Sequence, residues 1–253
     1  MATPTPAPAS ATSVCDLRRL PLIETPFPHV VHDAFVEPAI FSAARDAFPG
    51  CPPSTGPTGF SLYWEDADYQ ALLASSPAWR ALSSLFHSQA FIDWAVDQFA
   101  PVWAADGCKI DVSRATYVDY HESRADKERN TIAQIVHQPH ELFVRMDIHQ
   151  GRVGYTRAVH RDHARRLISM LVYMVNQDAI EMAGGELILH PVPLQRLWKP
   201  TVTVSPKQNL MVAFPCGNRS HHSVAPITST ARPRNYIQVQ ISSSVDIWPR
   251  SRF

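Results

Sequence analysis

The sequence predicts an α+β fold, with helices in the first half of the chain and strands in the second half. Two observations carry this prediction. The first hundred residues repeat apolar positions at helical spacing between capping residues, and the remainder alternates short β-branched runs with turn residues. A chain of 253 residues also buries a sizeable core without disulfides. We therefore expect a helical layer on an antiparallel, barrel-like core.

Capping residues mark the expected helices. An apolar-periodic run begins at Glu37-Pro38, continues to Phe48 and is closed by Pro49-Gly50. A second helix begins at Ser76-Pro77, and Ser88 caps a third, which Pro101 ends. A loop rich in Pro, Gly and Ser, residues 50–59, separates the first two helices.

The strands expected in the second half are short and rich in β-branched residues, as in an antiparallel sandwich or barrel. They are Lys109–Tyr117, Glu141–Ile148, Tyr155–Asp162, Leu167–Val175, Glu186–His190, Thr201–Val204, Asn209–Phe214 and Asn235–Ser243.

Composition excludes several classes of protein. Lys plus Arg and Asp plus Glu both number 23, so a basic surface for nucleic acid and an acidic disordered chain are disfavoured. No apolar run is long enough to span a membrane. Residues 1–14 form an expected flexible Ala/Thr/Pro tail without the pattern of a secretory signal, and the four cysteines form no CxxC pair, so we expect a reduced, cytoplasmic protein.

Two charged segments leave alternatives open. Residues 119–129 hold seven charged side chains, which predicts a solvated, mobile loop, with a lid over a site as the alternative. Five arginines surround residue 160, namely Arg152, Arg157, Arg161, Arg165 and Arg166. A solvated strand edge is the favoured interpretation of these arginines, and attraction of anions is the alternative.

Twelve histidines in a neutral chain direct attention to metal binding. His160 and Asp162 lie two residues apart in an expected strand, so both side chains point to one face and reach one ion. A second histidine follows sixty residues later, at His221 or His222. Two histidines and one carboxylate form the facial triad of non-haem Fe(II) oxygenases. The HxD spacing alone is a weak signal.

The order of the motifs along the chain strengthens the indication of an iron site. After His160-Arg161-Asp162 come a strand ending in Tyr173, the turn Gly184-Gly185-Glu186-Leu187, and then His222-Ser223-Val224-Ala225-Pro226 followed by basic residues. Over residues 140–245 this series resembles the iron- and 2-oxoglutarate-dependent dioxygenases, in particular their prolyl-4-hydroxylase-like branch. The resemblance implies a double-stranded β-helix (jelly-roll, cupin-like) core with N-terminal supporting helices. It also implies the iron ligands His160, Asp162 and His222, with His221 as the competing distal ligand.

The resemblance further implies that an arginine opening the last strand binds 2-oxoglutarate. Ile237, Val239 and Ile241 share the expected buried face of this strand, so Arg234 continues the opposite, polar face while Arg232 lies in a turn. Tyr173 is the second candidate contact of the co-substrate. The remaining candidates for the pocket are Gln238, Gln240 and His149.

The resemblance therefore implies a single domain over residues 15–253, with a helical part at about 36–105 and a jelly-roll core at about 109–245. The implied activity is hydroxylation of an unactivated C–H bond in an amino acid, peptidyl residue or small metabolite. Its cofactors are Fe(II), 2-oxoglutarate and O2, and its co-products are succinate and CO2. No nucleic-acid or membrane partner is expected. A non-catalytic cupin-like binding module, or an interaction domain that uses residues 119–129, remains the alternative.

Overall fold

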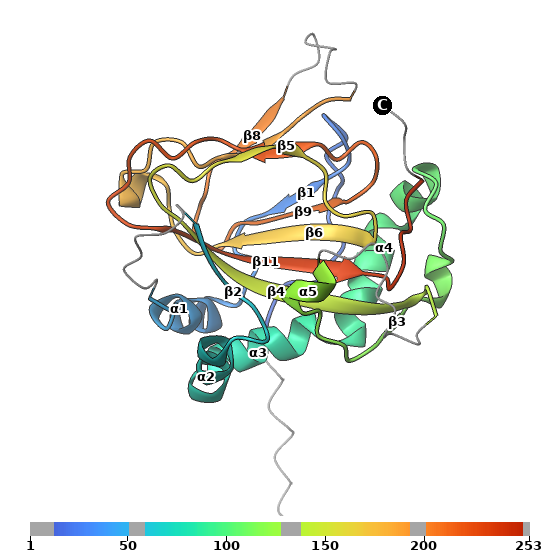
Figure 1. Ribbon diagram of the computed structural model, residues 1–253, viewed down its shortest axis with the longest axis horizontal. Helices are drawn as coiled ribbons and strands as arrows, with labels where there is room; N and C mark the ends of the chain where they lie inside the picture. Colours follow the sequence, from blue (N-terminus) through green and yellow to red (C-terminus); the bar gives the residue numbers. More distant parts are fainter. Residues whose placement is uncertain (1–12, 51–58, 128–137, 193–200, 250–253) are drawn as a thin grey trace, which may run out of the picture.

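Two antiparallel sheets form the centre of the molecule (Figure 1). The computed structural model describes residues 13–50, 59–127, 138–192 and 201–249. The large sheet has the order β1 (Val30–His32), β9 (Met211–Pro215), β6 (Arg166–Tyr173), β11 (Arg234–Ser242), β4 (Glu141–Gly151) and β2 (Gly59–Leu62), and β3 (Thr116–Tyr117) pairs with β4. The small sheet has the order β5 (Arg157–His160), β10 (His222–Val224), β7 (Leu187–Leu189) and β8 (Val202–Val204). This arrangement confirms the predicted α+β jelly roll.

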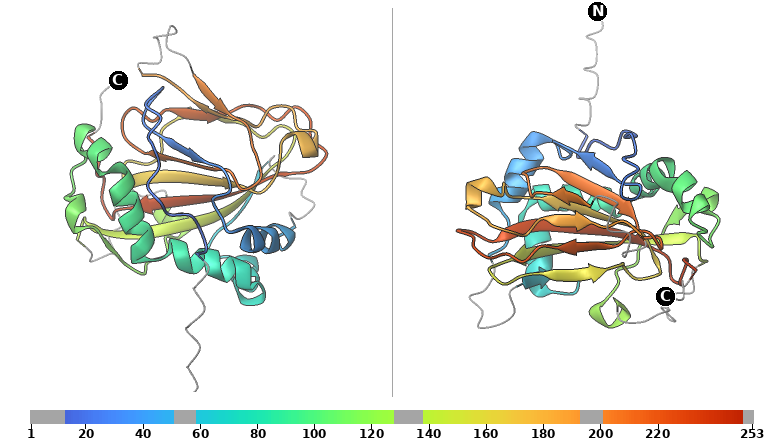
Figure 2. Two further views of the ribbon diagram at one scale, coloured as in Figure 1. Left: turned by 180° about the vertical axis from the view of Figure 1, so that it is seen from behind. Right: turned by 90° about the horizontal axis from the view of Figure 1, so that it is seen from above.

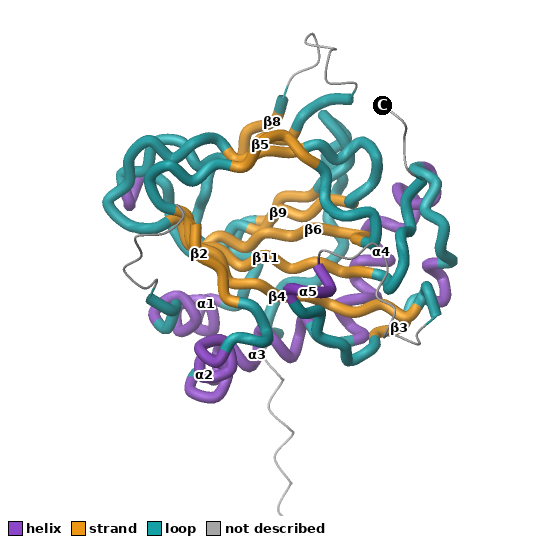
Figure 3. The backbone as a smooth tube through the Cα atoms, viewed as in Figure 1, coloured by secondary structure: helices purple, strands orange, loops and turns teal. Residues whose placement is uncertain are grey.

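Helices α1 (Pro38–Asp46), α2 (Ala67–Ser75), α3 (Pro77–Phe86) and α4 (Gln89–Ala105) lie along one face of the large sheet, as the view from behind shows (Figure 2, left). The short α5 (Arg124–Lys127) lies on the opposite side, in front of β4 and β11 in Figure 1. Turns of 3-10 helix occur at Val112–Arg114 and Asp178–Ile180. In the tube view the strands form the two layers, and α1, α2 and α3 lie beneath the large sheet (Figure 3). No helix among the described residues is long and apolar enough to cross a membrane.

The capping residues fix the helix starts as predicted. The side chain of Glu37 accepts a hydrogen bond from the backbone N–H of Ile40, and Ser76 and Ser88 cap α3 and α4 in the same way. The predicted end at Pro101 is wrong, because α4 continues through this residue to Ala105. The lost backbone hydrogen bond is tolerated because the last turn buries Trp103, whose Nε1 donates to the carbonyl of Leu167 at 3.2 Å.

Three other elements differ from the prediction. Most of residues 109–117 is not strand, because the side chain of Asp111 accepts from the N–H of Ser113 and favours a 3-10 turn. Helix α2 was not predicted, since it buries only Tyr69 and Leu72 and so has no clear apolar stripe. Strand β5 is shorter than expected and ends at His160. Most of the predicted tail, and most of the loop 50–59, lie outside the described residues.

Strand β11 separates the apolar core from a polar interior. Ile237, Val239 and Ile241 are fully buried in the cluster that also contains the α3 and α4 side chains Trp79 and Phe99. The alternate side chains of β11 point to the other face, toward the space between the two sheets. The predicted alternation along this strand is therefore confirmed, and it leaves one polar surface inside the molecule.

The charged segment 119–129 is not a solvated loop in its described part, residues 119–127. The side chain of Glu122 is fully buried and forms ion pairs with Arg145 (2.9 Å), Arg165 (2.7 Å) and Arg166 (2.5 Å). Arg165 and Arg166 are buried as well, so the interpretation of these two residues as an exposed strand edge is wrong. The alternation of side chains along a strand could not reveal the burial of Arg165 and Arg166, because their counterion lies about forty residues away in the sequence. One carboxylate thus fixes the segment before α5 to β4 and β6.

Replacement of Glu122 by Gln should strongly destabilise the fold, because it leaves three buried guanidinium groups without their shared counterion. We expect a loss of about 3–5 kcal/mol in the free energy of unfolding at pH 7, measured by urea denaturation. The exposed carboxylate Glu65 pairs with Arg124, and Glu65→Gln is the matched control, with an expected change below about 1 kcal/mol. Equal effects of the two substitutions would refute the central role of Glu122.

The contribution of the Glu122 carboxylate to the free energy of unfolding should also depend on pH. Burial opposes ionisation of Glu122, but the three arginines outweigh it and lower its pKa from 4.5 to about 2. A carboxyl group with a depressed folded-state pKa stabilises the protein fully above its unfolded pKa. The stability difference between the parent and Glu122→Gln should therefore shrink as pH falls from 4.5 to about 2.

Candidate metal centre

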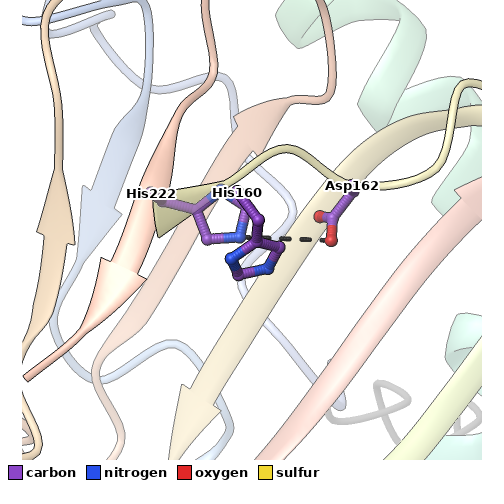
Figure 4. Close-up of side chains that lie close together, drawn as sticks. All are labelled: His160, Asp162 and His222. Carbon is purple, nitrogen blue, oxygen red and sulfur yellow. Dashed lines mark ion pairs between the residues drawn. The ribbon is translucent and has the colours of Figure 1, made fainter. Parts of the chain in front are cut away.

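Two imidazoles and one carboxylate meet at the edge of the small sheet (Figure 4). His160 is the last residue of β5, His222 is the first residue of β10, and the two are direct partners in the antiparallel pair. Asp162 follows β5 by two residues. One potential ligand atom from each residue lies within 4.8 Å of the other two. The Nε2 atom of His222 lies 4.0 Å from Oδ1 of Asp162.

Backbone hydrogen bonds orient both imidazole rings. Nδ1–H of His160 donates to the carbonyl of Ala158 at 2.8 Å, and Nδ1–H of His222 donates to the carbonyl of Ser220 at 3.0 Å. Each ring is thus held in the tautomer whose Nε2 carries a free lone pair. Metal-binding histidines characteristically use this arrangement, in which the second nitrogen is anchored by a carbonyl or carboxylate.

The protonation states in this group also suit a cation. Burial lowers the pKa of His222, which keeps its ring neutral. Burial raises the pKa of Asp162, but the neighbouring His222 and His160 and the guanidinium of Arg166 outweigh this effect and hold the pKa below its usual value. Neutral imidazole and ionised carboxylate are the forms that coordinate a divalent metal.

Asp162 lies two residues beyond the end of β5, in an irregular segment. Between His160 and Asp162, Arg161 donates to Oδ1 of Asn218 at 2.6 Å and is not part of the group of three. His221 is buried but does not belong to the group of three, and its backbone carbonyl accepts from the N–H of His190.

A second feature of the interior is a buried arginine with unused donors. Arg234 is fully buried at the start of β11, and its Nη2 donates to the hydroxyl of Tyr173 at 3.2 Å. Its guanidinium carbon lies 4.4 Å from the ring centre of Tyr236. The Nε and Nη1 atoms have no hydrogen-bond partner among the described residues. Since burial of an uncompensated guanidinium is costly, this side chain is suited to an anionic ligand.

Arg232 takes a different position. It is exposed in the turn before β11, and its Nη2 donates to the carbonyl of Ala179 at 3.2 Å. Together with Arg45 it borders a separate cavity, at the other face of the β11 start. The two arginines are therefore distinct in environment, and only Arg234 reaches the polar interior.

One cavity connects the metal group with the polar face of β11. It has a volume of about 340 Å³, at the lower end of the range of about 300–1,000 Å³ typical of ligand pockets. The metal group and the three candidate pocket residues all line it, namely His160, Asp162, His222, Gln238, Gln240 and His149.

Several lining residues were not found from the sequence. The ring of His149 stacks on Tyr236 with centres 5.0 Å apart, and its Nδ1 lies 2.7 Å from the hydroxyl of Ser61 in β2. Tyr155 places its hydroxyl 3.1 Å from that of Tyr236. Ser61 and Tyr155 carried no motif, and only the pairing of β2 and β11 with β4 brings Ser61 and Tyr236 beside His149.

Ser169 links the pocket amides to the carboxylate of the metal group. This fully buried hydroxyl accepts hydrogen bonds from Nε2 of Gln238 at 3.2 Å and of Gln240 at 3.5 Å. It also hydrogen bonds to Asp162, which in addition accepts from the thiol of Cys216 at 3.5 Å. Ser169 and Cys216 thus hold the Asp162 carboxylate in place.

Fold and site together define a cupin-like jelly roll with a candidate metal-binding group at one cavity and a buried cation, Arg234, packed on the cavity-lining ring of Tyr236. Residues 144–240 match the model of the 2OG-Fe(II) oxygenase superfamily. This segment of the chain is therefore similar to the 2OG-Fe(II) oxygenases, and the similarity implies Fe(II), 2-oxoglutarate and O2 as cofactors.

Comparison with solved structures agrees with the fold. An oxidoreductase of the 2OG-Fe(II) oxygenase family from Burkholderia pseudomallei is 12% identical, with a TM-score of 0.52 and coverage of 89% of this chain and 88% of that one. A prolyl-4-hydroxylase from Pseudomonas putida is 14% identical, with a TM-score of 0.49 and coverage of 85% and 92%. A search of curated protein sequences found no match.

Replacement of Ser169 by Ala should weaken metal binding, because the hydroxyl holds the Asp162 carboxylate in place. Loss of such a supporting group typically lowers metal affinity by about 10- to 100-fold. Anaerobic equilibrium dialysis with Fe(II) measures the change. Ser83→Ala is the control, since Ser83 is buried in α3, away from the cavity. An unchanged Fe(II) affinity in Ser169→Ala would show that Ser169 only fills space.

Proposed function

We propose that the protein hydroxylates an unactivated C–H bond of an amino acid, peptidyl residue or small metabolite, with succinate and CO2 as co-products. In this proposal His160, Asp162 and His222 bind Fe(II), and Arg234 and Tyr173 bind 2-oxoglutarate. The observation that carries it is the convergence of two anchored imidazoles and an ionised carboxylate within 4.8 Å at a cavity.

The surroundings of Arg234 support the co-substrate assignment. A dicarboxylate requires a fixed cation at a distance from the metal, and the planar guanidinium bonds a carboxylate at two points. Two unused donor atoms of Arg234 point to such a ligand. The Tyr173 hydroxyl lies beside the same guanidinium and offers a further hydrogen bond to the carboxylate.

The residues of the chain bind and orient the reactants, and they exclude water from the site. When bound, iron with 2-oxoglutarate and O2 supplies the oxidising power that breaks a C–H bond. His160, Asp162 and His222 would hold the ion, and a facial set of three protein ligands would leave coordination positions free for the reactants. Leu171 and Leu187 line the cavity beside the metal group and exclude water from it, while Gln238, Gln240 and His149 offer hydrogen bonds that orient a substrate.

A single catalytic domain over residues 15–253 is part of this proposal. The main apolar cluster supports it, because its members run from Cys15 to Trp248 and combine helix and large-sheet residues. Asp162 also distinguishes hydroxylation from halogenation, since the carboxylate occupies a coordination position that a halide would need.

The metal assignment is tested on anaerobic protein. Addition of Fe(II) and 2-oxoglutarate should produce a visible charge-transfer band, and turnover should release succinate. Asp162→Ala and His222→Ala should each lose most Fe(II) binding, because two ligands hold the ion poorly. His221→Ala is the matched control and should retain the band. Absence of both the band and succinate with every substrate tried would contradict the proposed activity.

The two arginines before and at β11 give a second test. Arg234→Met removes the buried cation while keeping the length of the side chain, and should raise the dissociation constant for 2-oxoglutarate at least about 30-fold. Titration of the charge-transfer band measures this constant. Arg232→Met should change it little, since Arg232 is exposed and outside the cavity. A larger effect of Arg232→Met would reverse the assignment.

A further inference from the structure

An irregularity in β5 determines what faces the metal cavity. In the pair of β5 with β10, His160 lies opposite His222 and Arg157 lies opposite Val224. One residue lies between the partners on β10, but two lie between them on β5, so β5 contains a bulge of one extra residue. In a regular strand Arg157 and His160 would point to opposite faces. The bulge brings both onto the face of His222 and Val224, which line the cavity.

Arg157 is an exposed residue of the outermost strand of the small sheet, and it lines the cavity together with its neighbour Thr156. The next two residues, Ala158 and Val159, do not line it. Thr156 anchors the strand before the bulge through a hydrogen bond from its hydroxyl to the carbonyl of Val224 at 3.0 Å.

The charges at the cavity leave Arg157 without a counterion. Among the described residues, Arg157 and Asp162 are the only lining side chains with a permanent charge, and Arg157 forms no ion pair. On the proposed function, the two charges of Fe(II) and the charge of Arg234 balance Asp162 and the two carboxylates of 2-oxoglutarate. The loaded site then retains one positive charge, which is that of Arg157.

We infer that Arg157 binds an anionic group of the primary substrate, and that this substrate is a small molecule or chain end that carries a carboxylate. The inference rests on the proposed function and defines its substrate class. The other lining residues that the structure describes offer hydroxyl and amide groups, such as those of Ser61 and Gln238, but no second arginine or lysine. A carboxylate at Arg157 would leave the rest of the substrate near His160 and the metal.

Two other roles of Arg157 give different results in the same experiment. Bulges and charges on an edge strand also prevent association with other sheets, in which case Arg157 would bind no ligand. Arg157 could equally serve the co-substrate. Only a role in substrate recognition predicts that the arginine discriminates between a carboxylate and an uncharged amide of the same shape.

The test uses the full chain, kept anaerobic and saturated with Fe(II) and 2-oxoglutarate. The probes are the N-acetyl derivatives of the common amino acids, the free amino acids, and the primary amide of each. Calorimetric titration measures their dissociation constants. We expect the acid of at least one pair to bind about 10- to 100-fold more tightly than its amide, as for hydrogen bonds to charged groups.

In Arg157→Gln this preference should fall to about one, because glutamine hydrogen bonds to acid and amide alike. The control Arg114→Gln changes an exposed arginine of the 3-10 turn Val112–Arg114 and should retain the full preference. The dissociation constant of 2-oxoglutarate, read from the charge-transfer band, should remain unchanged in Arg157→Gln.

Three results would overturn the inference while the proposed function stands. These are absence of any acid preference in the parent protein, an unchanged preference in Arg157→Gln, and a loss of 2-oxoglutarate affinity in that variant. The last result would assign Arg157 to the co-substrate. Failure of the proposed function itself is recognised separately, because the parent protein would then show no charge-transfer band.

Discussion

The alternation of side chains along β11 is the constraint on which the molecule depends. This strand lies between β6 and β4 in the large sheet, so both of its edges are fixed by hydrogen bonds. Ile237, Val239 and Ile241 can pack against the helices only if the intervening residues face the other sheet. A slip of one residue in register would turn Ile237, Val239 and Ile241 toward the small sheet. It would also bury Arg234 among the helices. The apolar packing on one face of β11 therefore fixes the position of the buried Arg234 on the other.

The sequence predicted the features that depend on local pattern. Helix caps, strand alternation in β11 and the order of motifs each involve neighbouring residues, and these led to the correct fold and to the residues that meet at the cavity. Features that depend on distant contacts were missed. The ion pairs of Glu122 with Arg165 and Arg166 join residues about forty positions apart, and no local sequence pattern predicts them. Asp162 was expected to share a strand with His160, but β5 ends at His160, so the two residues meet although Asp162 lies outside the strand.

The interior separates two kinds of buried arginine. Arg145, Arg165 and Arg166 share the carboxylate of Glu122, and Arg166 also donates to the hydroxyl of Ser242 at the end of β11. Arg234 lies at the beginning of the same strand and contacts only aromatic rings and the Tyr173 hydroxyl among the described residues. A buried ion pair is structurally inert toward further anions, whereas an uncompensated guanidinium attracts one. Burial of an arginine alone therefore does not indicate an anion-binding site. The indication is a buried arginine that has no carboxylate beside it.

The metal group and the co-substrate cation belong to different sheets, and this division has a consequence for specificity. The large sheet carries Arg234 on a central strand, where both neighbours restrict its position. The small sheet carries His160 and Arg157 on its edge strand, which pairs on one side only and so accommodates an inserted residue. A bulge in β11 would disturb two ladders and the apolar packing behind them, whereas the bulge in β5 changes only which side chain faces the cavity. Within this fold, the edge strand beside the metal is thus the place where substrate recognition can vary while the geometry for the common co-substrate stays fixed.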